Sequence, residues 1–136
     1  MRGAPDAPPP PDQPWYAELL AATTADDAVA RFVEGHTRIS ARIAVLDDMV
    51  RCAVHEPEAV AVHANGAKRR RRQLGELVDH LDSQFGLREG LTRGVCLDLL
   101  LTYTGPATYR QLVVDFGWSR ADFEAWLRET IRSLLA

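Results

Sequence analysis

Cysteine is scarce in this chain, and long apolar runs are missing from it. Among 136 residues there are two cysteines, Cys52 and Cys96. Two are too few for the disulfide framework of a small secreted domain, and we expect both to be small core residues in a reducing cytoplasm. No apolar run approaches the ~20 residues of a membrane-spanning helix. The N-terminal residues contain no apolar segment, so the sequence predicts no secretory signal and no membrane contact.

The motifs of common catalytic and cofactor sites are also missing. There is no two-histidine metalloprotease motif and no cysteine pair at zinc-finger spacing. A phosphate loop, a nucleophile elbow and a dinucleotide-binding glycine pattern are missing too. The sequence therefore predicts no enzyme, no cofactor and no metal site. The net charge of −3 argues against a protein that binds nucleic acid over its whole surface.

Proline is concentrated at one end of the chain. Six of the eight prolines lie within residues 1–14, where they restrict the backbone to extended conformations. This segment is expected to be a disordered tail or the remnant of a linker. Residues 15–136 are long enough for one domain with one hydrophobic core.

The apolar residues of this domain recur at alternating intervals of three and four, which is the spacing of amphipathic helices. Two such stripes are long: one from Val29 to Ala53 and one from Val60 to Phe85. No segment alternates with a period of two, so the predicted fold class is all-α, a multi-helix bundle. Capping and turn residues divide it into expected helices at residues 15–22, 25–53, 57–85, 93–103, 106–116 and 120–134.

Three polar residues interrupt the two apolar stripes. His36 lies on the first stripe, and His63 and Arg70 lie on the second. A lone histidine on an apolar face is usually a hydrogen-bonded core residue, and Arg70 can snorkel, pair with a carboxylate or meet a ligand. Three polar groups on the inner faces of two neighbouring helices also suit a ligand pocket. Its apolar walls would come from Phe32, Met49 and Tyr103.

A run of basic residues, 68–72, surrounds Arg70. Five consecutive helical residues sweep more than one turn, so they cannot share one face. We therefore expect the run to be mostly a solvated helix surface rather than a nucleic-acid patch, with Arg70 alone pointing inward.

The segment 95–101 is apolar on nearly every face. A helix of this kind needs cover on all sides, and a small domain has few helices to supply it. A second copy of the chain is the partner we expect, giving a homodimer. The alternative is that the first long helix and the 106–116 segment cover it completely.

Residues 98–127 resemble the C-terminal part of TetR-family transcriptional regulators. The resemblance covers about residues 14–135 and is most specific in the last forty. Its motifs are an aspartate that opens an apolar helix, a Thr-x-Pro turn and several aromatic positions. They are Asp98, Thr104-Gly105-Pro106, Tyr109-Arg110, Leu112-Val113-Val114, Gly117-Trp118-Ser119, Phe123 and Trp126-Leu127.

The resemblance implies that residues 15–136 form an effector-binding and dimerisation domain of a cytoplasmic bacterial repressor or other regulator. The pocket would lie between the helices at 25–55, 58–85 and 106–116. Segments 93–103 and 120–135 would form the dimer interface. Its residues would be Val95, Leu99, Leu100, Phe123, Trp126, Leu127, Ile131 and Leu134.

One part of the family pattern is not in this sequence. TetR-family regulators bind DNA through an N-terminal helix-turn-helix domain, and residues 1–14 do not form one. The chain is therefore expected to be a fragment, the product of a start codon assigned too late, or a natural paralogue without the DNA-binding head. The predicted function is binding of a small, largely apolar molecule, coupled to DNA release in a full-length protein. The alternative is a helical adaptor that pairs with a related regulator and binds neither ligand nor DNA.

Overall fold

The computed structural model describes residues 14–52 and 57–136, with the side chains of 14–38, 40 and 65–136. The elements in these ranges are helical, and the only β pairing there is an isolated bridge between Leu87 and Leu135. They are α1 (Pro14–Ala21), α2 (Ala25–Cys52), α3 (Pro57–Phe85), α4 (Arg93–Tyr103), α5 (Pro106–Tyr109), the π-helix η2 (Arg110–Asp115) and α6 (Arg120–Arg132). The all-α prediction is confirmed. None of the described helices is long and apolar enough to cross a membrane.

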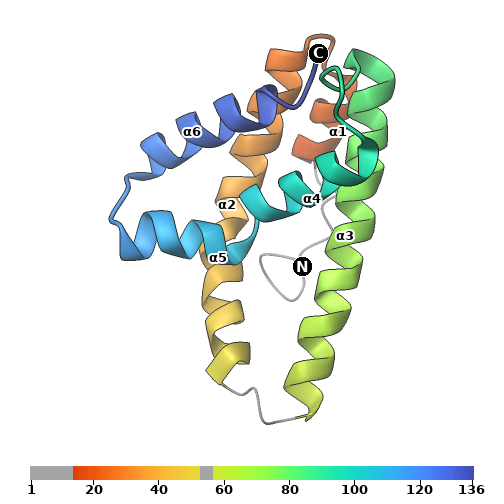
Figure 1. Cartoon of the computed structure of the whole chain (residues 1–136). Coiled ribbons are helices and arrows are strands. Elements are labelled where there is room, and N and C mark those ends of the chain that lie inside the picture. The colour runs from red at the N-terminus through yellow and green to blue at the C-terminus, as the bar shows by residue number, and fades with distance from the viewer. Residues whose placement is uncertain (1–13, 53–56) are drawn as a thin grey trace.

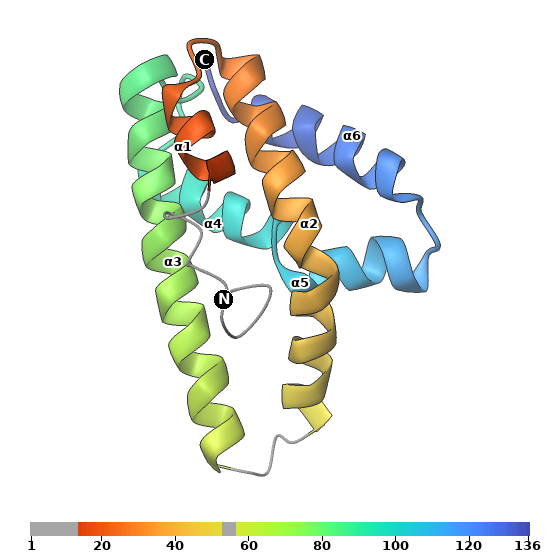
Figure 2. The same cartoon turned by 180° about the vertical axis from the view of Figure 1, so that it is seen from behind.

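The two long helices α2 and α3 run in opposite directions and form the frame of the molecule (Figure 1). Helix α4 crosses between them on one side, and α1 lies between their upper halves on the other side (Figure 2). Helices α5 and α6 pack against α2, while α4 packs chiefly against α3. Within the described side chains, the short helices thus cover the part of each apolar stripe that lies in the upper half of the molecule.

Hydroxyl side chains cap three of the helices, as the sequence predicts. The side-chain oxygens of Thr24, Thr92 and Ser119 each accept a hydrogen bond from the amide three residues later, at 3.1, 3.2 and 3.0 Å. Each bond satisfies one of the free amides at a helix N-terminus. Gly86, at a φ of 79°, ends α3 in the left-handed conformation that favours glycine.

The segment after Pro106 differs from the expected single helix. Only one α-helical turn forms, and a π-helix follows, in which the amide of Phe116 donates to the carbonyl of Gln111 at 2.9 Å. The wider π turn changes which side chains face inward. Phe116, at the C-terminal end of this segment, is 62% exposed, and Val114 is 63% exposed. The prediction of one helix over 106–116 is therefore wrong in its second half.

One hydrophobic core joins the helices. Leu19 of α1, Val33 of α2, Leu77 of α3, Leu100 of α4 and Phe123 of α6 are all 0–1% exposed within it. Cys96 is buried in the same core and forms no disulfide, as predicted. The side chain of Cys52 lies outside the described residues. Two polar side chains outside this apolar core, His36 and Arg70, are partly buried.

Candidate functional site

Arg70 reaches from α3 to the C-terminal end of α4. Its Nη2 donates hydrogen bonds to the carbonyl oxygen of Leu101 at 2.7 Å and to the hydroxyl oxygen of Thr104 at 2.6 Å. Thr104 is buried, and its hydroxyl donates in turn to the carbonyl of Leu100 at 2.6 Å. The last carbonyls of a helix lack partners within the helix and carry partial negative charge. Arg70 therefore supplies both donors and a positive charge to the end of α4.

His36 approaches the same point from α2. Its ring stacks on that of Phe32, one turn earlier, with centroids 5.6 Å apart and planes 11° from parallel. Burial lowers the pKa of His36 to about 4, the positive charge of Arg70 lowers it as well, and a hydrogen bond to the backbone of Thr104 opposes these effects. The imidazole is therefore neutral at pH 7.

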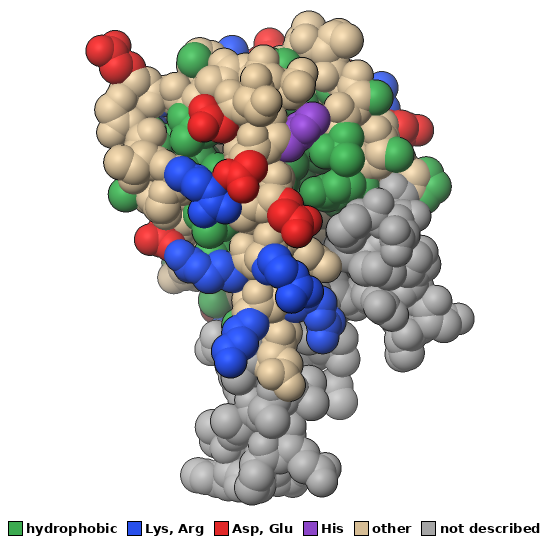
Figure 3. Space-filling model, turned by 90° about the vertical axis from the view of Figure 1, so that its right-hand side faces the viewer, with side chains coloured by type: hydrophobic (Ala, Val, Ile, Leu, Met, Phe, Trp, Pro, Cys, Tyr) green, Lys and Arg blue, Asp and Glu red, His purple; other side chains and the backbone are tan. Residues whose placement is uncertain are grey.

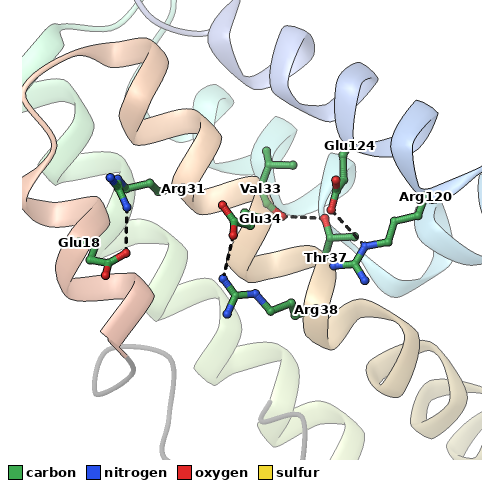
Figure 4. Close-up of polar contacts among 8 residues, drawn as sticks. All are labelled: Glu18, Arg31, Val33, Glu34, Thr37, Arg38, Arg120 and Glu124. Atoms are coloured by element: carbon green, nitrogen blue, oxygen red, sulfur yellow. Dashed lines mark hydrogen bonds and ion pairs between the residues drawn. The ribbon is translucent and has the colours of Figure 1, made fainter.

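The positive charge of Arg70 is partly buried and has no carboxylate partner among the described residues. Burial lowers its pKa to about 10, so the guanidinium is still protonated at neutral pH. Among residues 65–136 and the described part of α1 and α2, no carboxylate pairs with it. The arginines of the pairs Glu18–Arg31, Glu34–Arg38 and Arg120–Glu124 in Figure 4 are, by contrast, exposed at the surface. Arg70 with neutral His36 and the ring of Phe32 forms the candidate site.

The structure divides the six residues predicted to form the pocket. Phe32, His36 and Arg70 come together as expected. The ring of Tyr103 contacts that of Trp126 on α6, with centroids 6.0 Å apart at 80°. Its place in the wall of this site stays a prediction. The side chains of Met49 and His63 lie outside the described residues.

The basic run around Arg70 forms a mixed surface, as the sequence predicts. Lys68, Arg69, Arg71 and Arg72 are exposed and Arg70 alone turns inward. Arg71 pairs with Asp98 at 3.0 Å. Figure 3 shows basic side chains gathered on the lower part of this face, with acidic side chains mainly above them. An open groove of about 410 Å³ between α3 and α4 is lined by four basic and two acidic side chains, and Arg93 and Asp79 among them form an ion pair.

The predicted dimer-interface residues separate into two groups. Val95 is 50% exposed, and Leu99 and Trp126 are half-buried at the surface. The other five are at most 3% exposed, because α2 and the other helices of the same chain cover them: Leu100, Phe123, Leu127, Ile131 and Leu134. Side chains buried in this way offer no surface to a second copy. Their assignment is corrected to the core. The alternative, complete cover of 95–101 by the first long helix and the 106–116 segment, is wrong as well, because α4 packs chiefly against α3 and Val95 is 50% exposed.

A second feature was missed by sequence reasoning. Trp118, Asp122, Ala125, Trp126 and Glu129 line an open groove of about 360 Å³ along one side of α6. Trp118 is held at the end of η2, where its amide donates to the carbonyl of Leu112 at 2.9 Å. The i, i+4 and i+7 spacing of Asp122, Trp126 and Glu129 was the available signal.

No family model matches this chain, and no curated protein or solved structure matches it. The resemblance to TetR-family regulators therefore rests on its sequence motifs and stays a prediction. Within the described residues, no group of three histidine, cysteine, aspartate or glutamate side chains is placed to hold a metal ion.

Proposed function

We propose that this chain is a helical effector-sensing domain related to the C-terminal part of TetR-like regulators. Its ligand would be a small, largely apolar molecule that binds between α2 and α3. In a full-length protein, binding would be coupled to the release of DNA by an N-terminal helix-turn-helix domain, in the cytoplasm. The observation that carries this proposal is the partly buried, protonated Arg70 beside neutral His36 and the ring of Phe32.

The chemistry of the site favours a ligand with one anionic or acceptor group. Nη2 of Arg70 is used by α4, and the guanidinium carries further N–H groups. Hydrogen bonds between a guanidinium and a carboxylate are about twice as strong as neutral ones. Phe32 supplies apolar contact, and neutral His36 donates or accepts a hydrogen bond. A fatty acid or another apolar carboxylic acid fits these groups.

The position of Arg70 also suggests how binding would be transmitted. The same guanidinium holds the end of α4 through Leu101 and Thr104. A ligand that draws Arg70 toward itself weakens that contact and shifts α4. Helix α4 carries Val95 and Leu99 at the surface, where we propose that a second copy of the chain binds. Coupling between two such sites is typically about 1–3 kcal/mol and is reciprocal.

Replacing Arg70 with methionine tests the ligand site. We expect the variant to lose about 1.5–3 kcal/mol of unfolding free energy, because buried acceptors at the end of α4 lose a charged donor. Its affinity for decanoate should fall about tenfold while that for decanol is unchanged. Competition with 1-anilinonaphthalene-8-sulfonate fluorescence measures both affinities, and urea unfolding measures the stability.

Arg71→Met is the matched control, because Arg71 is the next residue and its ion pair with Asp98 is exposed. It should change stability by less than about 1 kcal/mol and leave decanoate binding unchanged. If the two variants bind decanoate alike, Arg70 is only a cap for α4 and the ligand proposal fails.

Replacing Val95 with glutamate tests the proposed dimer. Val95 is 50% exposed, so the substitution should change the unfolding free energy of the monomer itself by less than about 1 kcal/mol. Sedimentation velocity should nevertheless show the parent as a dimer and the variant as a monomer. Arg128→Glu, on an exposed position of α6, is the control and should remain dimeric. A monomeric parent would exclude self-association through α4.

The exposed side chains of η2 and its C-terminal end favour a second function, the helical adaptor. Val114 and Phe116 are 63% and 62% exposed, and a helical partner bound over η2 would cover both side chains. In that case the chain would pair with a related regulator and bind no small molecule. Failure of both decanoate and decanol to bind the parent protein would favour this function.

A further inference from the structure

The groove on α6 has the composition of a site for an organic cation, and it is separate from the site at Arg70. Trp118 and Trp126 meet nearly at right angles, with ring centroids 6.2 Å apart and planes at 89°. Trp126 also packs against Tyr103 and Phe123, and both tryptophans line the groove, so one small group there can contact both indole rings. Asp122 and Glu129 complete the lining, and none of the five lining residues is basic.

The two carboxylates of the groove are available to a ligand. Asp122 and Glu129 are exposed, and neither forms an ion pair within the described part of the chain. Glu124, on another side of the same helix, differs because it is paired with Arg120 at 3.2 Å (Figure 4). Asp122 lies in the first turn of α6, where its charge offsets the partial positive charge of the helix N-terminus.

We propose that this groove binds a small organic cation with an alkylammonium or guanidinium group. Cations are attracted to the face of an aromatic ring within about 6 Å of its centroid, and tryptophan is the strongest of the aromatic residues in this respect. The nearby carboxylates add charge complementarity. The groove volume of about 360 Å³ is within the range of small-molecule sites.

A second copy of the chain, bound through the same face, is a less suitable occupant. A two-fold interface places the same surface of each copy against the other. The unpaired carboxylates of Asp122 and Glu129 would then approach those of the second copy, and like charges repel across an interface. Charge therefore favours a cationic ligand over self-association here.

Titration with choline, followed by the three tryptophan indole N–H signals in a ¹H–¹⁵N NMR spectrum, tests the proposal. Choline should shift the signals of Trp118 and Trp126 and leave that of Trp15, on α1, unchanged. The neutral isostere 3,3-dimethylbutan-1-ol has the same shape without the charge, and we expect it to bind about tenfold more weakly. A second titration uses the peptide Gly-Arg-Gly, which carries a guanidinium group. Tighter binding of choline would indicate an alkylammonium ligand, and tighter binding of the peptide would indicate a guanidinium ligand.

Charge-neutral variants separate this site from non-specific attraction. The double variant Asp122→Asn, Glu129→Gln should weaken choline binding about fivefold at low ionic strength. Glu124→Gln removes one charge from the same helix outside the groove and should change the affinity by less than about twofold.

Three results would overturn the proposal. The first is equal binding of choline and its neutral isostere. The second is an equal loss of affinity in Glu124→Gln and the double variant. The third is a shift of Trp118 that depends on protein concentration and not on either cation, which would assign the groove to a second copy of the chain. All three leave the decanoate measurement at Arg70 unaffected.

Discussion

Replacing Phe123 with alanine is expected to lower the unfolding free energy by about 3–5 kcal/mol, the usual cost of removing a buried phenyl ring. Phe123 is 0% exposed, and its ring contacts those of Tyr109 and Trp126 at centroid distances of 5.2 and 6.0 Å. Alanine would leave a cavity at the junction of α5 and α6. Since these contacts lie within one chain, the loss should be the same at all protein concentrations.

Urea unfolding followed by circular dichroism, at two protein concentrations tenfold apart, measures this effect. Arg128→Ala is the control, because Arg128 is exposed on the same helix, and it should cost less than about 1 kcal/mol. If the Phe123→Ala protein is as stable as the parent but no longer forms a dimer, Phe123 belongs to the dimer interface and not to the core. The experiment therefore decides between core and interface for this residue.

The protein is expected to become less stable as the pH falls from about 6.5 to 4, because His36 is neutral in the folded state. Its pKa is about 4 in the folded chain, against the ordinary value of 6.5 that an exposed histidine has in the unfolded chain. Between these values the unfolded chain binds a proton that the folded chain does not, so protonation favours unfolding. The stabilisation is complete above pH 6.5 and is lost toward pH 4. The loss is at most about 3 kcal/mol.

Urea unfolding at pH 7.5, 6, 5 and 4 gives the slope of stability against pH. His36→Gln is the reference variant, because glutamine retains hydrogen-bonding groups and does not titrate. The difference between the unfolding free energies of the two proteins at each pH gives the contribution of His36 alone. Carboxylates such as Asp79, whose pKa is lowered by its hydrogen bonds to Arg93, contribute equally to both proteins and cancel. Parallel curves for both proteins would mean that His36 is accessible enough to protonate without unfolding.

Much of the candidate site was predictable from helical spacing alone. The three-and-four pattern placed Phe32 and His36 on the inner face of one helix and Arg70 on that of the next. It did not reveal the partner of Arg70, because the end of α4 lies 31 to 34 residues further along the chain. Helix packing brings these groups together, and periodicity within one helix carries no information about it.

The predicted dimer interface also shows that spacing within one helix does not reveal which surface covers its apolar side. Phe123, Leu127 and Ile131 form an apolar stripe at i, i+4 and i+8, and such a stripe looks the same in a monomer core and in a dimer interface. The packing of α6 on α2 within one chain shows that these three residues belong to the core. The exposed Phe116 arose from a π turn, which local apolar spacing does not predict.

The sequence by itself determined the helices of this protein and most of their ends. Caps such as Thr92 and Ser119, turn glycines such as Gly86 and the prolines act through neighbouring backbone groups, so their effects are local and can be read along the chain. Only the tertiary structure decided which apolar residues are covered and where the buried charge of Arg70 finds its acceptors. The same holds for the two tryptophans and two carboxylates that share one groove. These features depend on contacts between helices, whose energies come from packing and burial rather than from sequence neighbours.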